Sequence, residues 1–153
     1  MPQLFLLIAL FCLGCTGQGQ NGILPENYPP DLTLRYHYDG GMQYYSEDLL
    51  LTKDSCVFNK NDNGKKTTLK FVLSKTEWEA FYAMLKKNHF DKIEYRTESN
   101  VYDRGGIRMD LSWNKDQRTL KIDDSQVSFV EKRWDKDWNA ICQYISELTK
   151  SKK

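Results

Sequence analysis

Side chains able to do chemistry are few in this sequence and lie far apart. His37 and His89 are the two histidines, and no Cys-x-x-Cys or His-x-x-x-His spacing is present. A zinc site needs about four ligands at suitable spacing. The sequence therefore predicts no metal site, and no motif in it predicts a cofactor.

One stretch carries oxygen ligands at regular spacing. Asn59, Asn61, Asn63 and Gly64 match the first half of a calcium-binding EF-hand loop, but Lys70 occupies the position of the bidentate carboxylate. An ammonium group cannot coordinate calcium, and the stretch lacks the negative charge to hold one. Asn63-Gly64 is instead typical of a tight β-hairpin turn.

Catalytic motifs are also missing. The sequence contains no Gly-x-Ser-x-Gly elbow, no glycine-rich phosphate loop and no His-Glu-x-x-His. The sequence leaves open a catalytic pair of Cys56 or Cys142 with a histidine, because the two partners need only meet in space. Asp123-Asp124 is interpreted as a turn at the end of a hairpin. We assign no catalytic residue, and an enzyme remains the alternative to a binding module.

Composition excludes one class of partner. The 153 residues carry 22 basic and 21 acidic side chains, with both signs interspersed, for a formal charge of +1. A nucleic-acid-binding domain shows a basic patch or stripe instead. Aromatic residues make up 13% of the chain, which argues against disorder. We expect a folded domain that does not bind nucleic acid.

The first 14 residues predict an export signal. Leu4 to Leu13 is an unbroken apolar run of ten residues. A membrane-spanning helix needs roughly 20 such residues, whereas the apolar region of a cleaved signal has about 7–15. We therefore expect residues 1–14 to be removed from the mature protein.

Leu13-Gly14-Cys15, directly after this run, resembles the lipobox of bacterial lipoproteins. The resemblance covers the first fifteen residues, and Cys12 stands where that family favours leucine. It implies cleavage before Cys15 and a lipid on that residue, which would attach the protein to a membrane. The alternative is an ordinary secretory signal cut near Gly17.

The rest of the chain predicts one α+β domain. Residues 15–31, rich in glycine and proline, are expected to form a flexible tether, and residues 32–153 the domain. Strand-like alternation occurs at 32–38, 48–52, 56–60, 67–73, 107–113 and 120–122, with a short strand at 93–96. Helical periodicity occurs at 74–88 and 135–150. We expect an antiparallel sheet of roughly five to seven strands with two helices packed on one face.

Tyrosines beside glycine turns are the remaining candidates for recognition. Tyr44, Tyr45 and Tyr102 lie in the stretches 36–45 and 95–106, where aromatic residues and glycine turns coincide. Tyrosine gives contact area at modest entropic cost. We expect a partner-binding surface centred on these two stretches. The alternative is that the tyrosines only pack at a sheet edge.

Two cysteines remain in the mature domain. Cys56 lies on a predicted strand and Cys142 on the flank of the apolar stripe of the last helix. The compartment beyond the inner membrane is oxidising, so we predict a Cys56–Cys142 disulfide between sheet and helix. Two reduced, buried cysteines are the alternative.

These patterns predict a small lipoprotein of the bacterial cell envelope. In layout the chain is similar to small uncharacterised envelope lipoproteins of Gram-negative bacteria, which implies an outer-membrane lipoprotein facing the periplasm. A secreted protein is the alternative location. We expect a binding or structural module whose partner is an envelope protein or a glycan. A hydrolase-type envelope enzyme and a secreted inhibitor are the alternative functions.

Overall fold

The computed structural model describes residues 23–42, 44–100 and 102–152. Its strands are β1 (Thr33–Asp39), β2 (Tyr45–Leu51), β3 (Cys56–Asp62), β4 (Lys65–Phe71), β5 (Tyr95–Thr97), β6 (Gly106–Trp113), β7 (Arg118–Asp124) and β8 (Ser128–Val130). Its helices are α1 (Lys75–Lys87) and α2 (Asp135–Ser151), with single 3-10 turns at Phe90–Lys92 and Lys132–Trp134. The predicted signal and Cys15 lie outside the described residues.

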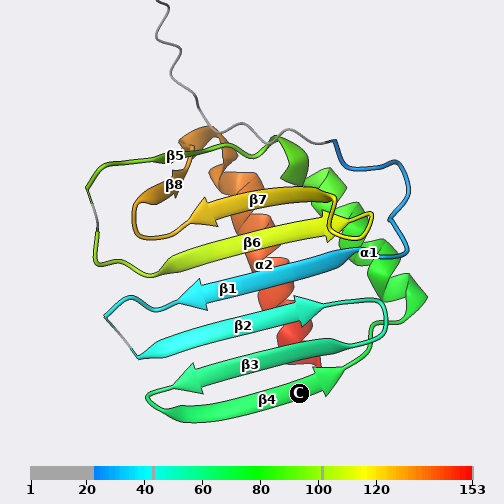
Figure 1. The fold of residues 1–153 in the computed structure, drawn as a ribbon, viewed down its shortest axis with the longest axis horizontal. Coiled ribbons are helices and arrows are strands. Elements are labelled where there is room, and N and C mark those ends of the chain that lie inside the picture. The colour runs from blue at the N-terminus through cyan, green and yellow to red at the C-terminus, as the bar shows by residue number, and fades with distance from the viewer. Residues whose placement is uncertain (1–22, 43, 101, 153) are drawn as a thin grey trace, which may run out of the picture.

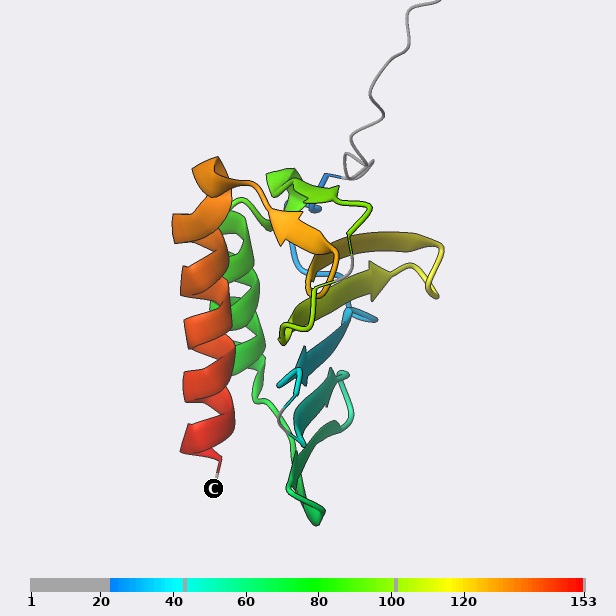
Figure 2. The same ribbon diagram turned by 90° about the vertical axis from the view of Figure 1, so that its left-hand side faces the viewer.

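The expected fold class is confirmed. Six strands form one antiparallel sheet in the order β4-β3-β2-β1-β6-β7, and β5 pairs with β8 in a small second sheet beside β7 (Figure 1). Both helices cover the same face of the larger sheet, and no described segment covers its other face (Figure 2). We call this uncovered side the open face.

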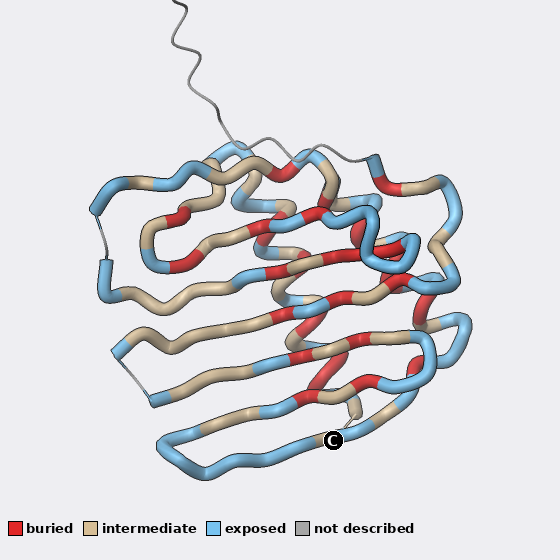
Figure 3. The backbone as a smooth tube through the Cα atoms, in the orientation of Figure 1, coloured by how far each residue is buried: buried red, intermediate tan, exposed pale blue. Residues whose placement is uncertain are grey.

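The central strand β1 shows how the sequence separates the two faces. Leu34 and Tyr36 are buried beneath the helices, whereas Arg35 and His37 alternate with them and point to the open face. Since successive side chains of a strand point to opposite sides, the neighbouring strands continue both rows. The buried residues accordingly gather between sheet and helices, toward one end of the strands (Figure 3).

The apolar stripes of both helices pack on the sheet as predicted. On α1 the buried residues are Trp78, Phe81, Tyr82 and Leu85. On α2 the buried side chains of the predicted stripe are Trp138, Ile141, Ile145 and Leu148. These spacings of three and four residues place each set on one side of its helix.

A capping box forms the start of α1. The Ser74 hydroxyl accepts a hydrogen bond from the Glu77 backbone N–H at 3.3 Å, and Glu77 Oε2 accepts one from the Ser74 N–H at 2.8 Å. The other carboxylate oxygen of Glu77 pairs with the ammonium of Lys152, just after α2. The bonds from Lys152 and Ser74 together lower the pKa of Glu77 to about 2.

This lowered pKa predicts acid sensitivity. A carboxyl group with a depressed folded-state pKa contributes stability above its unfolded pKa of about 4.5, and this contribution disappears as pH falls toward about 2. Glu77→Gln should lower the free energy of unfolding at neutral pH by about 0.5–1 kcal/mol, because the ion pair is partly exposed. The variant should also flatten the pH dependence between about 4.5 and 2. Urea titrations across this range measure both effects. Glu79→Gln on the same helix, with one exposed contact to Lys75, should change neither.

The domain begins earlier in the chain than the sequence pattern predicted. Leu24 is buried in the core, the Tyr82 hydroxyl donates a hydrogen bond to the Pro25 carbonyl at 2.6 Å, and the Tyr28 ring lies 6.3 Å from that of Tyr82. The segment from Leu24 onward is therefore packed on α1 and is not part of a tether. Its apolar residues are isolated among prolines and have no periodicity, so composition alone made the segment look unstructured.

Candidate functional site

The two glycine turns that the sequence singled out pack against each other. They lie at one end of the sheet, between β1 and β2 and between β5 and β6 (left side of Figure 1). A Cβ atom on Gly105 would lie 2.2 Å from the Asp39 carbonyl oxygen, and one on Gly41 would lie 2.6 Å from the Gly105 nitrogen. Contact at this distance between two backbones requires glycine.

Exposed apolar side chains gather on these turns, which we call the turn end. The side chains of Met42 and Tyr44 are 80% and 82% exposed, and that of Tyr102 is 39% exposed. They account for three of the five large exposed hydrophobic residues among the described residues. A hollow of about 250 Å³ adjoins Tyr102, and its lining is Asp39, Gly41, Tyr102, Asp103, Arg104 and Gln126. Met42 was not a predicted candidate, although its place directly after Gly41 was a usable signal.

Tyr102 is held by neighbouring side chains. Its ring packs edge-on against that of Phe129, with 5.5 Å between the ring centres. Its hydroxyl donates a hydrogen bond to Glu98 at 2.9 Å. On the same Phe129 ring lies the guanidinium of Arg104, 4.2 Å from the ring centre. Arg104 also donates to Asp124 at 3.0 Å, and so ties the turn end to the edge of the larger sheet.

Tyr44 combines an exposed side chain with a fixed backbone. Its carbonyl oxygen accepts a hydrogen bond from the Asn63 N–H in the β3–β4 turn at 2.7 Å. The backbone at Tyr44 is therefore anchored while the ring faces solvent. Functional residues commonly sit on loops held in this way by a rigid scaffold.

Tyr45 has a different environment from Tyr44 and Tyr102. Its ring packs edge-on against Tyr38 at 5.7 Å, its hydroxyl donates to Glu47 at 2.5 Å, and the Lys60 ammonium lies 4.8 Å from its ring centre. Burial and the bond to Glu47 raise its pKa. We therefore interpret Tyr45 as a packing residue. The structure brings Tyr44 and Tyr102 to one end of the sheet and gives Tyr45 a structural role beside them.

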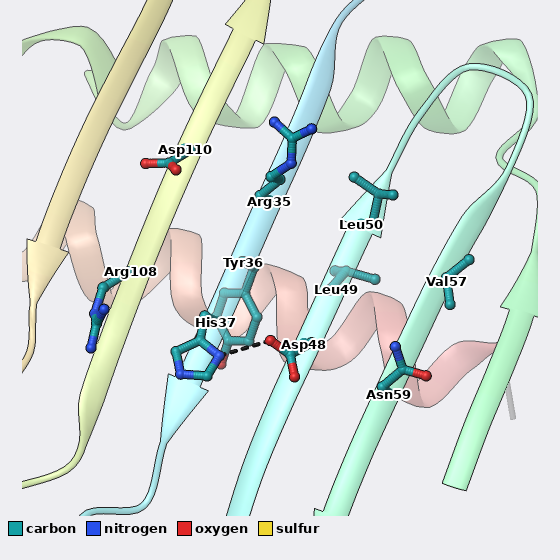
Figure 4. Close-up of a pocket in the computed structure, with 10 residues that line it drawn as sticks. All are labelled: Arg35, Tyr36, His37, Asp48, Leu49, Leu50, Val57, Asn59, Arg108 and Asp110. Carbon is teal, nitrogen blue, oxygen red and sulfur yellow. Dashed lines mark hydrogen bonds and ion pairs between the residues drawn. The ribbon is translucent and has the colours of Figure 1, made fainter.

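The open face contains a second concave region, with a volume of about 520 Å³ (Figure 4). Its polar and charged lining residues are Arg35, His37, Asp48, Asn59, Arg108 and Asp110, and its apolar part includes Leu50 and Val57. His37 and Asp48 face each other on adjacent strands, with 2.8 Å between Nδ1 and Oδ1. A carboxylate can orient an imidazole for proton transfer. Among the described residues that line this region, however, there is no serine, threonine or cysteine for the imidazole to activate.

The other histidine lies elsewhere. His89 follows α1 with its Nδ1 atom 3.4 Å from Asp137 Oδ1, beside the Trp134 ring. Within the described ranges, no three or more histidine, cysteine, aspartate or glutamate side chains are grouped so that they could hold a metal ion.

The predicted disulfide is absent from the structure, where Cys56 and Cys142 are both free thiols. Cys56 is opposite Phe71 in the sheet, and the Lys152 ammonium lies 6.0 Å from the Phe71 ring. Cys56 is thus near the end of α2, whereas Cys142 lies ten residues earlier, or about 15 Å along the helix axis. The helical pattern correctly placed Cys142 near the buried stripe but could not specify which strand of the sheet it lies over.

Both thiols are poor nucleophiles in this structure. Burial raises the pKa of the Cys56 thiol above its ordinary value. Burial, together with the nearby Asp124 carboxylate, raises the pKa of Cys142 to about 12. Because the thiolate is the reactive form, neither environment favours a catalytic cysteine.

Comparison with known proteins adds no functional assignment. No family model matches the chain, and no curated protein is significantly similar to it. None of the helices in the described parts of the chain has the length and apolar character needed to cross a membrane.

Proposed function

We propose that this protein is a lipoprotein of the bacterial cell envelope, lipidated at Cys15, whose domain binds a macromolecular partner through the turn end. The observation that carries the binding part is the exposure of Met42, Tyr44 and Tyr102 on two turns that meet at Gly41 and Gly105, with the Tyr44 carbonyl bonded to Asn63. Exposed apolar side chains grouped together on a soluble domain are typical of an interaction site.

The proposed anchor restricts where the partner can be. Nine peptide units separate Cys15 from Leu24, the first buried residue in the part of the chain that the structure describes (24 − 15 = 9). Such a segment spans at most about 30 Å. A domain attached through Cys15 would work close to the membrane surface, so we favour an envelope protein as the partner. A glycan is the alternative, because aromatic rings also stack on sugars.

The test separates contact residues from packing residues. Tyr44→Ala combined with Tyr102→Ala should reduce capture of envelope components by the purified protein by about tenfold or more. Because the Tyr44 side chain is largely exposed, Tyr44→Ala alone should change the free energy of unfolding by less than about 0.5 kcal/mol. Quantitative mass spectrometry of captured material and urea titration give the two readouts.

Tyr45→Ala is the matched control, since it removes the adjacent tyrosine from a packed position. It should lower the free energy of unfolding by about 1–2 kcal/mol. While the variant remains folded, it should capture the same components as the unaltered protein. Equal capture by the unaltered protein and the Tyr44, Tyr102 double variant would rule out the turn end as the binding surface.

A further inference from the structure

A row of side chains whose charges are largely uncompensated crosses the open face and passes through its concave region. Following the strand register from β7 to β4, this row is Lys121, Asp110, Arg35, Leu50, Val57 and Lys70. It contains three cations, one anion and two aliphatic residues. None of its four charged groups has an ion pair or a side-chain hydrogen bond within the described residues.

The neighbouring row differs because its charged groups have partners. His37 pairs with Asp48, and Arg108 lies 3.9 Å from Asp123 and donates a hydrogen bond to Ser125 at 3.0 Å. Of these two rows, the one through Arg35 therefore carries the unpaired positive charge. Asp110 lies directly across from Arg35 on β6 but forms no ion pair with it.

Arg35 and its apolar neighbours occupy adjacent strands. Figure 4 shows Leu50 beside Arg35, with Val57 next to Leu50 on the following strand. Adjacent strands are about 4.8 Å apart, so Val57 lies roughly 10 Å from the strand of Arg35, a span that the long arginine side chain and an amino-acid-sized ligand cover together.

A further hydrogen-bond donor lies at the far side of the region. The Asn59 amide oxygen accepts a bond from the Thr68 hydroxyl at 2.7 Å, which directs the NH₂ group of Asn59 away from Thr68. No described residue accepts a bond from that NH₂ group. The lining thus offers a guanidinium, an aliphatic surface and an amide donor, and its volume falls in the usual range for small-ligand sites.

From this arrangement we infer that the open face binds a carboxylate that carries an aliphatic group beside the charge. Arg35 binds the carboxylate in the bidentate manner that a guanidinium favours. Leu50 and Val57 contact the aliphatic group, and Asn59 donates to a carbonyl on the rest of the ligand. A free organic acid and the C-terminal residue of a peptide share this chemistry. The site is separate from the turn end.

N-Acetyl-leucine is a suitable probe, because it combines a carboxylate, an aliphatic side chain and a carbonyl. Its dissociation constant is measured by saturation-transfer NMR with the full chain in lipid nanodiscs, and empty nanodiscs serve as the blank. We expect binding in the millimolar range or tighter. N-Acetyl-leucinamide, which lacks the charge, and acetate, which lacks the aliphatic group, should each bind at least tenfold more weakly. Equal binding of either control, or no binding of N-acetyl-leucine, would overturn the inference.

Two matched variants locate the site. Arg35→Gln should weaken binding by about tenfold or more, because it removes the charge-assisted hydrogen bonds. Lys121→Gln removes a cation of the same row at the edge of the sheet and should leave binding unchanged. Both side chains are exposed, so both variants should fold. An equal loss in both variants would show attraction by general charge alone and overturn the inference.

Two further experiments identify the source of the ligand and test whether the two sites are separate. A short peptide ending in leucine that binds tighter than N-acetyl-leucine would support a peptide C-terminus as the ligand. Equal affinity would support a free acid, and either result supports the shared chemistry. The Tyr44, Tyr102 double variant should bind N-acetyl-leucine normally, so failure of the turn-end proposal leaves this result standing. Loss of probe binding in that variant would contradict the separation of the sites.

Discussion

Cys15→Ala should abolish acylation of the protein completely. In the lipoprotein family that the first fifteen residues resemble, the cysteine thiol and the amino group freed by cleavage carry the lipid. Alanine has no thiol to which a lipid could be attached. A single acyl chain would in any case anchor a protein only marginally. Labelling with an alkyne-bearing fatty acid should therefore fall to background in this variant. Intact mass should show loss of the acyl groups.

Cys12→Leu is the matched control, because it changes the neighbouring signal cysteine to the residue that the family favours. It should leave acylation unchanged. Acylation that persists in Cys15→Ala, or an unmodified terminus at residue 16 or later in the unaltered protein, would contradict the lipoprotein proposal. The second of these results would favour an ordinary secretory signal.

Phe81→Ala should have the largest effect on stability, lowering the free energy of unfolding by about 3–5 kcal/mol. Phe81 is completely buried on α1. The centre of its ring lies 5.8 Å from that of the Trp78 ring and 6.2 Å from that of the Tyr144 ring on α2. Removing the ring would leave a cavity where both helices meet the sheet. The expected loss is a large part of the 5–15 kcal/mol typical of a whole domain.

Glu79→Ala provides the comparison for this prediction, since Glu79 is an exposed residue of the same helix. It should change the free energy of unfolding by no more than about 0.5 kcal/mol. Urea denaturation followed by far-UV circular dichroism measures both variants. A loss below about 1 kcal/mol for Phe81→Ala would mean that the helices do not pack on the sheet in this way.

The sequence predicted the helices and most strands because their signals are local. Ser74 and Glu77 mark the start of α1, and the spacing of Trp138, Ile141 and Ile145 defines the buried side of α2. Alternation along β1 likewise separated its buried residues from its exposed ones. Each of these patterns depends on residues close together in the chain.

Features that depend on distant segments were not predictable in the same way. The packing of Leu24 on α1 has no periodic signal, and the strand over which Cys142 lies depends on where α2 docks. The short strand β8 forms by pairing with β5, which lies about 30 residues earlier in the chain. Likewise, sequence patterns marked the glycines of both turns but could not show that the turns touch.

The same limit applies to the candidate sites. Composition singled out Tyr44, Tyr45 and Tyr102 together, but only the fold distinguishes the packed Tyr45 from the two others. Alternation along β1 puts Arg35 and His37 on one side of the strand, while their cross-strand neighbours depend on strand order. The concave region of the open face is consequently a feature of the assembled sheet.

Site-directed photocrosslinking in intact cells tests the central claim most directly, because it detects contacts of the turn end in its natural environment. A photoreactive phenylalanine analogue is placed at Tyr44, at Tyr102 and, as a control, at the exposed Glu79. We predict that the probes at Tyr44 and Tyr102 form the same crosslinked species and that the probe at Glu79 does not. No crosslink from either tyrosine position, or the same species from all three positions, would contradict a partner-binding role for the turn end.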